Sequence, residues 1–353
     1  MRYRVTALTP LLVGDGQKLS PIDYMVWKDH VNVLDQRRIF RLLAKGPRLD
    51  GYLNQLKRAD KLDFASWGGF AQNFAGRRIP FEHSSLTAHW ERASGDSLHI
   101  PTFACGVSGP YLPGAAIKGA LRTGQLFASL KEGSLKDLVE KFRGERPPRH
   151  PAIGPEEEVL GHSGRSRMRA ISAGDSQPVS QAVMKVYLLR VSTLLGRGQA
   201  GYTLGWKPNP LFAEMAPPGT TFEGAWQERN PGARSRIFEA SNLCAAEVLT
   251  LQKQYVSWTG LSGVGREIQE LETRLATLDR GAACLLSIGW GGGLLSKTAW
   301  LGKDSEDHSQ ILRSLPFYSR AVASGMPFPK TRRIVCQAGE PATLPGWVLL
   351  EVV

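Results

Sequence analysis

The sequence predicts an α+β protein, because strand-like and helix-like patterns both occur along its 353 residues. Residues 2–8 alternate polar and apolar side chains, which is the period of a half-buried strand. Residues 266–278 instead carry isoleucine and leucine at spacings of three and four, which is typical of an amphipathic helix. The 38 glycines and 22 prolines indicate many turns. With 42% hydrophobic residues, the chain has enough material for a sizeable core and two domains.

A glycine-containing loop at residues 12–18 follows the first strand and leads to a predicted hairpin. The hairpin pairs residues 24–27 with residues 31–34, two short apolar runs separated by polar residues. Asp35 then stands as the N-cap of a helix. The apolar stripe of that helix is expected to comprise Ile39, Phe40, Leu42 and Leu43. Residues 45–100 are only weakly periodic, so we expect an insertion there.

A turn at Pro113 and Gly114 opens the clearest predicted helix of the first half. Its core-facing residues, by helical spacing, are expected to be Ile117, Ala120, Leu121 and Ala128. Lys118 and Arg122 are four residues apart and share another face. Two interpretations of this pair stay open. It is either an ordinary solvated face, or a pair of cations beside a helix N-terminus whose N–H groups favour an anion.

The segment at residues 141–169 is rich in charge, proline and glycine, which predicts a mobile loop. Strand-like residues resume at 183–191, and a proline-rich stretch follows. Two helices are expected at residues 242–255 and 266–278. A buried strand then starts at residue 284 and runs into a glycine-rich loop, and a short strand is expected at 346–350.

The glycine-rich loop at residues 289–293 matches neither of two common nucleotide-binding motifs. Leu294 stands where a dinucleotide fingerprint needs its third glycine. Ser296 stands where a Walker A loop needs its second glycine. Two interpretations remain. The loop either offers unhindered N–H groups beside Lys297 to a phosphate backbone, or only lets two elements pack closely.

The chain is basic, since 44 lysine and arginine residues stand against 32 aspartate and glutamate residues for a net charge of +12. This balance favours a polyanion as partner, with nucleic acid as the first class to consider. No membrane span is predicted, because the longest apolar run has five residues and a membrane helix needs about 20. The N-terminus lacks the apolar centre of a secretory signal, so we expect a cytoplasmic protein.

Metal and hydrolase chemistry find no support in the sequence. The four cysteines form no CxxC pair. His83, His89 and His99 lie near Cys105, but their spacing matches no zinc motif, so we expect no metal site. No GxSxG elbow is present. Asp175 is open to two interpretations, a free acid or a hydrogen-bonded turn residue.

Residues 111–122, YLPGAAIKGALR, resemble the PGxxIKGALR signature of RAMP proteins, the RNA-binding subunits of type III CRISPR effector complexes. Residues 289–298 resemble the C-terminal glycine-rich loop of that family. Further landmarks are similar in order and spacing to the family of the fifth subunit of the Csm (type III-A) complex. These landmarks are residues 8–10 with Gly14 and Gly16, residues 18–23, 218–224 and 329–333, and residues 346–348.

The resemblance implies a RAMP fold of two ferredoxin-like (RRM-like) units with insertions. Residues 1–200 would form the first unit, with insertions at about 45–100 and 141–169, and residues 201–353 the second, with the glycine-rich loop. It implies a structural subunit of a ribonucleoprotein for antiviral defense that caps the crRNA 3′ end, without a cofactor or an active site. Assistance in crRNA 3′ maturation is a second role that this position allows. The implied partners are crRNA and the backbone and small subunits of the Csm complex, with target RNA nearby and no membrane.

Glycine loops and clustered cations are the residues expected to contact RNA phosphates. The predicted RNA-binding residues are Gly14, Gly16, Lys18, Lys118, Arg122, Gly289, Trp290, Gly291, Gly292, Gly293, Lys297, Lys330, Arg332 and Arg333. The rival hypothesis is a RAMP endoribonuclease that processes precursor crRNA, with His30 as general acid or base. No tyrosine or lysine clusters with His30 in the sequence in the way such a site would need.

Overall fold

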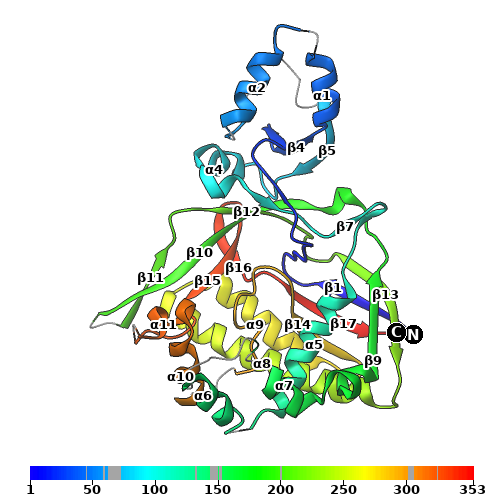
Figure 1. Ribbon diagram of the computed structural model, residues 1–353, viewed down its shortest axis with the longest axis vertical. Coiled ribbons are helices and arrows are strands. Elements are labelled where there is room, and N and C mark those ends of the chain that lie inside the picture. The colour runs from blue at the N-terminus through cyan, green and yellow to red at the C-terminus, as the bar shows by residue number, and fades with distance from the viewer. Residues whose placement is uncertain are drawn as a thin grey trace.

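A computed structural model describes residues 1–44, 46–58, 60–62, 73–131, 133–143, 150, 153–198, 201–300, 306–323 and 325–353. Helices pack against antiparallel sheets, which confirms the predicted α+β class (Figure 1). No helix in these ranges is long and apolar enough to cross a membrane.

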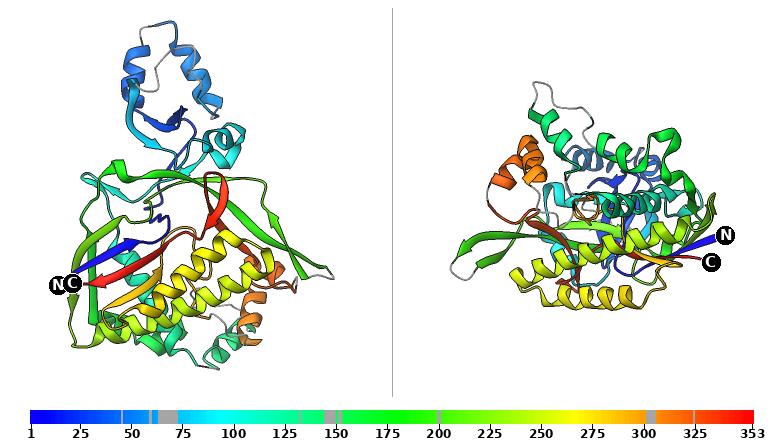
Figure 2. Two further views of the ribbon diagram at one scale, coloured as in Figure 1. Left: turned by 180° about the vertical axis from the view of Figure 1, so that it is seen from behind. Right: turned by 90° about the horizontal axis from the view of Figure 1, so that it is seen from below.

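The main sheet has five antiparallel strands, which include both the first and the last strand of the chain. Its order is β14 (Ala283–Ser287), β17 (Trp347–Val352), β1 (Arg2–Ala7), β13 (Thr221–Glu228) and β9 (Ile171–Ser176). The elements β1, α5 (Gly114–Ser129), β9, β13, α8 (Ala233–Thr259) and β17 follow the β-α-β-β-α-β order of a ferredoxin-like unit. Because Tyr3 pairs with Val352 in the β1–β17 ladder, the two termini lie side by side (Figures 1 and 2).

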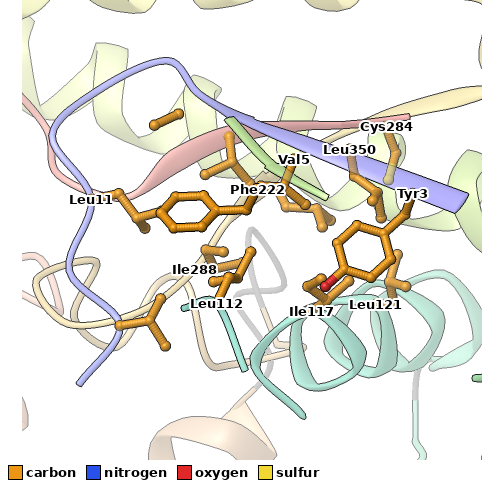
Figure 3. Close-up of a cluster of buried hydrophobic side chains, with 14 of the residues drawn as sticks. Tyr3, Val5, Leu11, Leu112, Ile117, Leu121, Phe222, Cys284, Ile288 and Leu350 are labelled. Atoms are coloured by element: carbon orange, nitrogen blue, oxygen red, sulfur yellow. The ribbon is translucent and has the colours of Figure 1, made fainter. Parts of the chain in front are cut away.

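Helix α5 packs its apolar face against the main sheet, as its sequence predicts. Ile117 and Leu121 are fully buried and point toward Tyr3 of β1 (Figure 3). The prediction that Ala128 faces the core is wrong: Ala128 is exposed, and Leu126 is buried in its place. The difference arises near the C-terminus of the helix, where Leu126 and Leu130 offer more apolar surface than an alanine.

A second sheet lies beside the first and carries a long projecting ribbon (Figures 1 and 2). Its order is β11 (Gly201–Trp206), β10 (Lys185–Gly198), β15 (Thr331–Gln337) and β16 (Glu340–Thr343), and β12 (Leu211–Met215) also pairs with β10. Helix α9 (Ser262–Thr277) shares a core with this sheet through Val264 and Ile268. Both sheets combine strands from the two sides of residue 200. The division into 1–200 and 201–353 therefore stays a prediction and does not correspond to separate sheets.

Much of the predicted 45–100 insertion belongs to a small ordered unit that projects from the body (Figure 1). The predicted hairpin is confirmed, and it joins a third strand from the insertion. The strands are β3 (Tyr24–Trp27), β4 (His30–Leu34) and β5 (Ala75–Pro80), and the helices of the unit are α1 (Gln36–Leu43), α2 (Leu49–Arg58) and α4 (Leu86–Arg92). Residues 45, 59 and 63–72 lie outside the described part of the chain. Arg77 of β5 forms an ion pair with Glu214 of β12, and the Glu214 side chain is fully buried. This ion pair connects the projecting unit to the body.

The N-cap of helix α1 is confirmed, since the Asp35 carboxylate accepts a hydrogen bond from the Arg38 N–H at 3.0 Å. Its predicted apolar stripe is only half right. Ile39 and Leu43 are buried, but Phe40 and Leu42 are 51% and 57% exposed. They lie outside the i, i+4 row that faces the small sheet.

The prediction of a loop over residues 141–169 is wrong for most of the residues described there. Helix α6 (Lys136–Arg143) ends in this segment, and α7 (Ile153–Leu160) is followed by 3₁₀ turns at Ser163–Arg165 and Arg167–Ala170. Residues 144–149 and 151–152 lie outside the described ranges. Leu160 and Met168 are buried in the main core, so two apolar anchors order a segment whose charged composition is typical of a loop.

Candidate nucleic-acid interface

Three segments that are far apart in the sequence line one groove. They are the loop at residues 12–18, helix α5, and the segment at residues 287–297. We call this cavity of about 600 Å³ the α5 groove. The predicted site residues that line it are Gly14, Gly16, Lys18, Gly289, Trp290 and Lys297. The folded chain therefore brings together two glycine loops that the sequence analysis singled out separately.

A local hydrogen bond and a glycine with a positive φ shape the loop at residues 12–18. The Asp15 carboxylate accepts a hydrogen bond from the Gln17 N–H at 3.0 Å. Gly16 has a φ of +92°, which favours glycine. Lys18 begins strand β2 (Lys18–Leu19), which pairs with β6 (Ile100–Pro101), and its side chain is exposed. The pairing fixes the Lys18 backbone while leaving its ammonium group in solvent.

The two glycine loops touch directly at Leu12. The Trp290 N–H donates a hydrogen bond to the Leu12 carbonyl at 2.7 Å. A Cβ atom at Gly289 would lie 2.2 Å from the same carbonyl oxygen, and the φ of Gly289 is +79°. Gly289 is therefore required for packing, which is the second of the two interpretations of this loop.

The other side of the glycine loop borders a second cavity of about 360 Å³, which we call the β15 groove. Its predicted site residues are Gly291, Gly292, Gly293, Lys330, Arg332 and Arg333. Within the described residues, the N–H groups of these three glycines donate no hydrogen bond. Gly291 and Gly293 have φ angles of +111° and +68°. Unpaired N–H groups on such a loop suit an anion, as the first interpretation requires.

Trp290 and Arg333 separate the two grooves. The Arg333 guanidinium carbon lies 4.8 Å from the centre of the Trp290 indole ring, within the range of a cation–π contact. Burial lowers the pKa of Arg333. Its Nε atom is buried and has no hydrogen-bond partner in the described part of the chain. Because Trp290 lines the α5 groove and Arg333 the β15 groove, one stacked pair contributes to both surfaces.

Arg332 is a packing residue, although the sequence assigned it to RNA. It is only 9% exposed and its Nε donates to Gln252 Oε1 at 2.6 Å. Its Nη1 donates to the Pro329 carbonyl at 2.6 Å and the Thr331 carbonyl at 3.0 Å. Its guanidinium carbon also lies 4.4 Å from the Tyr255 ring centre. Burial lowers the pKa of Arg332 to about 10, which leaves it a cation at neutral pH.

The cations of helix α5 do not line either groove. Successive residues of a helix are rotated by about 100°, so the face with Ala116, Gly119 and Thr123 lines the α5 groove and the face with Lys118 and Arg122 does not. Arg122 instead forms an ion pair with Glu156 of α7. The structure thus places Lys118 and Arg122 apart from the glycine loops with which they were grouped as predicted RNA-binding residues.

The N-terminus of α5 already holds a carboxylate. Asp175 of β9 accepts a hydrogen bond from the Gly114 N–H at 2.9 Å. A Cβ atom at Gly114 would lie 2.3 Å from the Ala173 carbonyl oxygen. Asp175 is therefore a hydrogen-bonded residue, but on a strand and not in a turn, and it fills the anion position that the sequence analysis left open.

His30 belongs to the projecting unit and lines neither groove. Its Nδ1 atom lies 2.7 Å from an Asp29 carboxylate oxygen, and this contact lowers the pKa of Asp29. Among the described residues, no three His, Cys, Asp or Glu side chains are grouped so that they could hold a metal ion.

The wall of the α5 groove was not predicted from the sequence. Ala116, Gly119, Ala120 and Thr123 form a row of small residues at spacings of three and four. That row was visible in the sequence as a signal for close approach along one helix face. Phe317 and Tyr318 of the β15 groove were also not predicted, because aromatic residues at the start of a helix more often indicate packing.

The comparisons with known proteins agree with this fold. A search of curated proteins finds no match. One similar solved chain comes from a cryo-EM structure of a Csm–crRNA–target RNA ternary complex of a type III-A CRISPR-Cas system. It is 22% identical with a TM-score of 0.69, over 99% of this chain and 100% of that chain. Another is the crystal structure of T. onnurineus Csm5, 20% identical with a TM-score of 0.65, over 98% of this chain and 99% of that chain.

These two likenesses extend over nearly the whole length of both partners and share the present architecture of antiparallel sheets and helices. The model of one protein family also matches residues 4–296. That range includes the loop at residues 12–18, helix α5 and the glycine loop at residues 289–293, which border the α5 groove. The chain belongs to the RAMP superfamily.

Proposed function

We propose that this protein is a non-catalytic, crRNA-binding subunit of a type III-A Csm interference complex. The observation that carries the proposal is the α5 groove, where two glycine loops and the exposed Lys18 and Lys297 meet beside a row of small residues. The overall likeness to a chain of a Csm–crRNA–target RNA complex supports it. The net charge of +12 favours the same class of partner.

The chemistry of the groove suits a phosphate backbone and does not read sequence. In the described part of the chain, Lys18, Lys297 and Lys330 form no ion pair with a carboxylate, so their charge is available to a ligand. The glycine loops allow a sugar–phosphate chain to approach backbone N–H groups closely. Binding should therefore depend strongly on salt and weakly on base sequence.

The groove is tested by measuring RNA affinity against salt for Lys297→Ala. Loss of one phosphate contact to a single strand lowers the salt slope by about 0.7, which is about five-fold in affinity at 0.1 M salt. Lys57→Ala, an exposed lysine of α2 in the projecting unit, is the matched control. Equal slopes for the two variants would remove the α5 groove from RNA binding.

We further propose that the protein holds the crRNA 3′ end, beside the backbone subunits of the complex and with target RNA nearby. A crRNA with photoreactive 4-thiouridine near one end, in the reconstituted complex, tests this directly. Cross-links to this protein should form from the 3′ end and not from the 5′ end. The reverse pattern would contradict the 3′ position. Because a 3′ cap limits access to that end, sequencing the copurified RNA should also give a defined 3′ boundary.

The alternative of a precursor-processing nuclease centred on His30 has one favourable observation, the His30–Asp29 contact. His30 nevertheless lies outside both grooves, so an RNA bound there would not present its backbone to the imidazole. Incubation of the purified protein with precursor crRNA separates the two hypotheses. The present proposal expects intact precursor, and defined products lost in His30→Ala would establish the nuclease.

A further inference from the structure

The rim of the β15 groove is aromatic. Phe317 and Tyr318 of α11 (Pro316–Ala323) meet edge to face with ring centres 4.9 Å apart. Tyr318 contacts Phe328 in the same way at 5.5 Å. Phe317 is 85% exposed, more than any other phenylalanine in the described part of the chain. Each of the three rings thus touches an aromatic neighbour, and the Phe317 side chain is nevertheless largely open to solvent.

A cation and backbone hydrogen-bond donors line the same groove. Lys330 lies beside the cis Phe328–Pro329 peptide and contributes a cation without a carboxylate partner in the described residues. The free N–H groups of Gly292 and Gly293 add neutral donors. One cavity therefore combines an exposed aromatic face with a cation and backbone donors. A nucleotide has the complementary pair of groups, a flat base and a phosphate.

We propose that the β15 groove binds a single unpaired nucleotide of RNA, with its base stacked on Phe317 and its phosphate beside Lys330 and the glycine loop. This inference rests on the proposed function and adds a subsite to it. A volume of about 360 Å³ is in the range of small-ligand pockets and is too small for a duplex. Stacking on an aromatic face is how proteins hold unpaired bases without regard to sequence.

The grooves also have a spatial relation that fits a strand passing from one to the other. Both border the same glycine loop, and the Trp290–Arg333 stack lies between them. A strand whose phosphates follow Lys297 and then Lys330 would pass from the α5 groove into the β15 groove, where Phe317 lies. The nucleotide at Phe317 is then the one beyond the segment in the α5 groove.

The test uses the full-length protein and a short single-stranded RNA carrying fluorescent 2-aminopurine at one position at a time. The wild-type protein should quench the fluorescence at one position. Phe317→Ala should abolish that quenching and weaken RNA binding about five-fold to 100-fold, without changing the salt slope, since no charge is removed. Phe317→Trp should keep both the quenching and the affinity, because it retains a stacking face.

Phe40→Ala is the matched control, since Phe40 is also an exposed phenylalanine but lies on α1 of the projecting unit. It should leave affinity and quenching unchanged. Wild-type affinity and quenching in Phe317→Ala would overturn the inference, and the aromatic rim would then be a surface for a protein partner. The proposed function fails separately, through unchanged salt slopes in Lys18→Ala and Lys297→Ala.

Discussion

Two segments of this protein look alike in sequence and differ in what their glycines and cations do. The start of α5 combines Gly114 with Lys118 and Arg122, and the loop at 289–297 combines several glycines with Lys297. At α5, Gly114 packs against the carbonyl oxygens of β9, Asp175 occupies the helix N-terminus and Arg122 pairs with Glu156. At the loop, N–H groups and a lysine that have no partner among the described residues border two grooves.

A glycine beside a cation can serve packing or ligand binding, and only its neighbours in the fold show which. Two observations decide between packing and binding: what a Cβ atom would meet, and whether the cation already has a carboxylate. By the first criterion Gly114 and Gly289 serve packing, while Gly293 faces open space. By the second, Arg122 already has a carboxylate partner, whereas Lys18 and Lys297 are available to a ligand.

The largest expected effect is on stability, at Gly114. Its Cβ atom in Gly114→Ala would lie 2.3 Å and 2.6 Å from the carbonyl oxygens of Ala173 and Gly174. Since backbone must move, we expect a loss of about 3 kcal/mol in the free energy of unfolding, measured by urea denaturation. Gly119→Ala on the same helix meets nothing within 4 Å and should raise stability by up to about 1 kcal/mol. Equal effects would remove the packing role of Gly114.

Arg332→Leu should have the next largest effect. The substitution leaves Gln252 Oε1 and the carbonyl oxygens of Pro329 and Thr331 without the Arg332 donors. Of these acceptors Gln252 is buried, and an unpaired buried acceptor costs about 1–3 kcal/mol in unfolding free energy. Lys330→Leu changes a partly exposed cation two residues earlier and should leave the midpoint of denaturation nearly unchanged while weakening RNA binding. A stable Arg332→Leu variant with weak RNA binding would return Arg332 to the RNA-contacting residues.

Gly292→Ala distinguishes packing from RNA binding inside the glycine-rich loop. The sequence predicts that it reduces crRNA retention with a modest loss of melting temperature. A Cβ atom there would lie 2.4 Å from Ser296 Oγ and 2.8 Å from Ser296 Cβ, so we expect a loss of about 1 kcal/mol in stability. Adding Ser296→Gly in the same chain should restore part of this loss. If RNA retention stays low in the restored double variant, Gly292 itself borders the phosphate. Full recovery of retention would make the loop purely a packing element.

Arg122→Ala should have the smallest effect. The Arg122 and Glu156 side chains are 47% and 24% exposed, and ion pairs of this kind contribute less than about 1 kcal/mol. Thermal denaturation should therefore change little, and RNA affinity should not change. A marked fall in RNA affinity would contradict the inference that Arg122 is paired with Glu156 and does not contact RNA.

Local patterns in the sequence predict the elements well where one residue type dominates. The alternation of residues 2–7 gave β1, and Asp35 and Pro113 gave two helix starts. Long-range partners could not be predicted in the same way. Nothing near Gly114 in the sequence indicates that Asp175 caps its helix, and nothing near Arg122 indicates Glu156. The order over residues 153–170 depends on Leu160 and Met168, two apolar residues in a charged segment.

The residues of the candidate site could likewise be predicted only in part. The glycine loops and most of the cations of both grooves were recognisable in the sequence, whereas the small residues of the α5 wall and the aromatic residues Phe317 and Tyr318 were not. Which of these cations are buried and which are open to a ligand could not be predicted from the sequence. Arg332 and Arg333 are neighbours, yet the strand alternation of β15 turns Arg332 into the core and Arg333 toward Trp290.

The central claim is that the grooves, and not the cations Lys118 and Arg122 of α5, bind RNA. The direct measurement compares the salt dependence of RNA affinity in two double variants, Lys18→Ala with Lys297→Ala, and Lys118→Ala with Arg122→Ala. The account predicts that the first pair lowers the salt slope by about 1.4, as expected for two lost contacts to a single strand, and that the second leaves it unchanged. A lowered slope in the second pair with an unchanged slope in the first would contradict it.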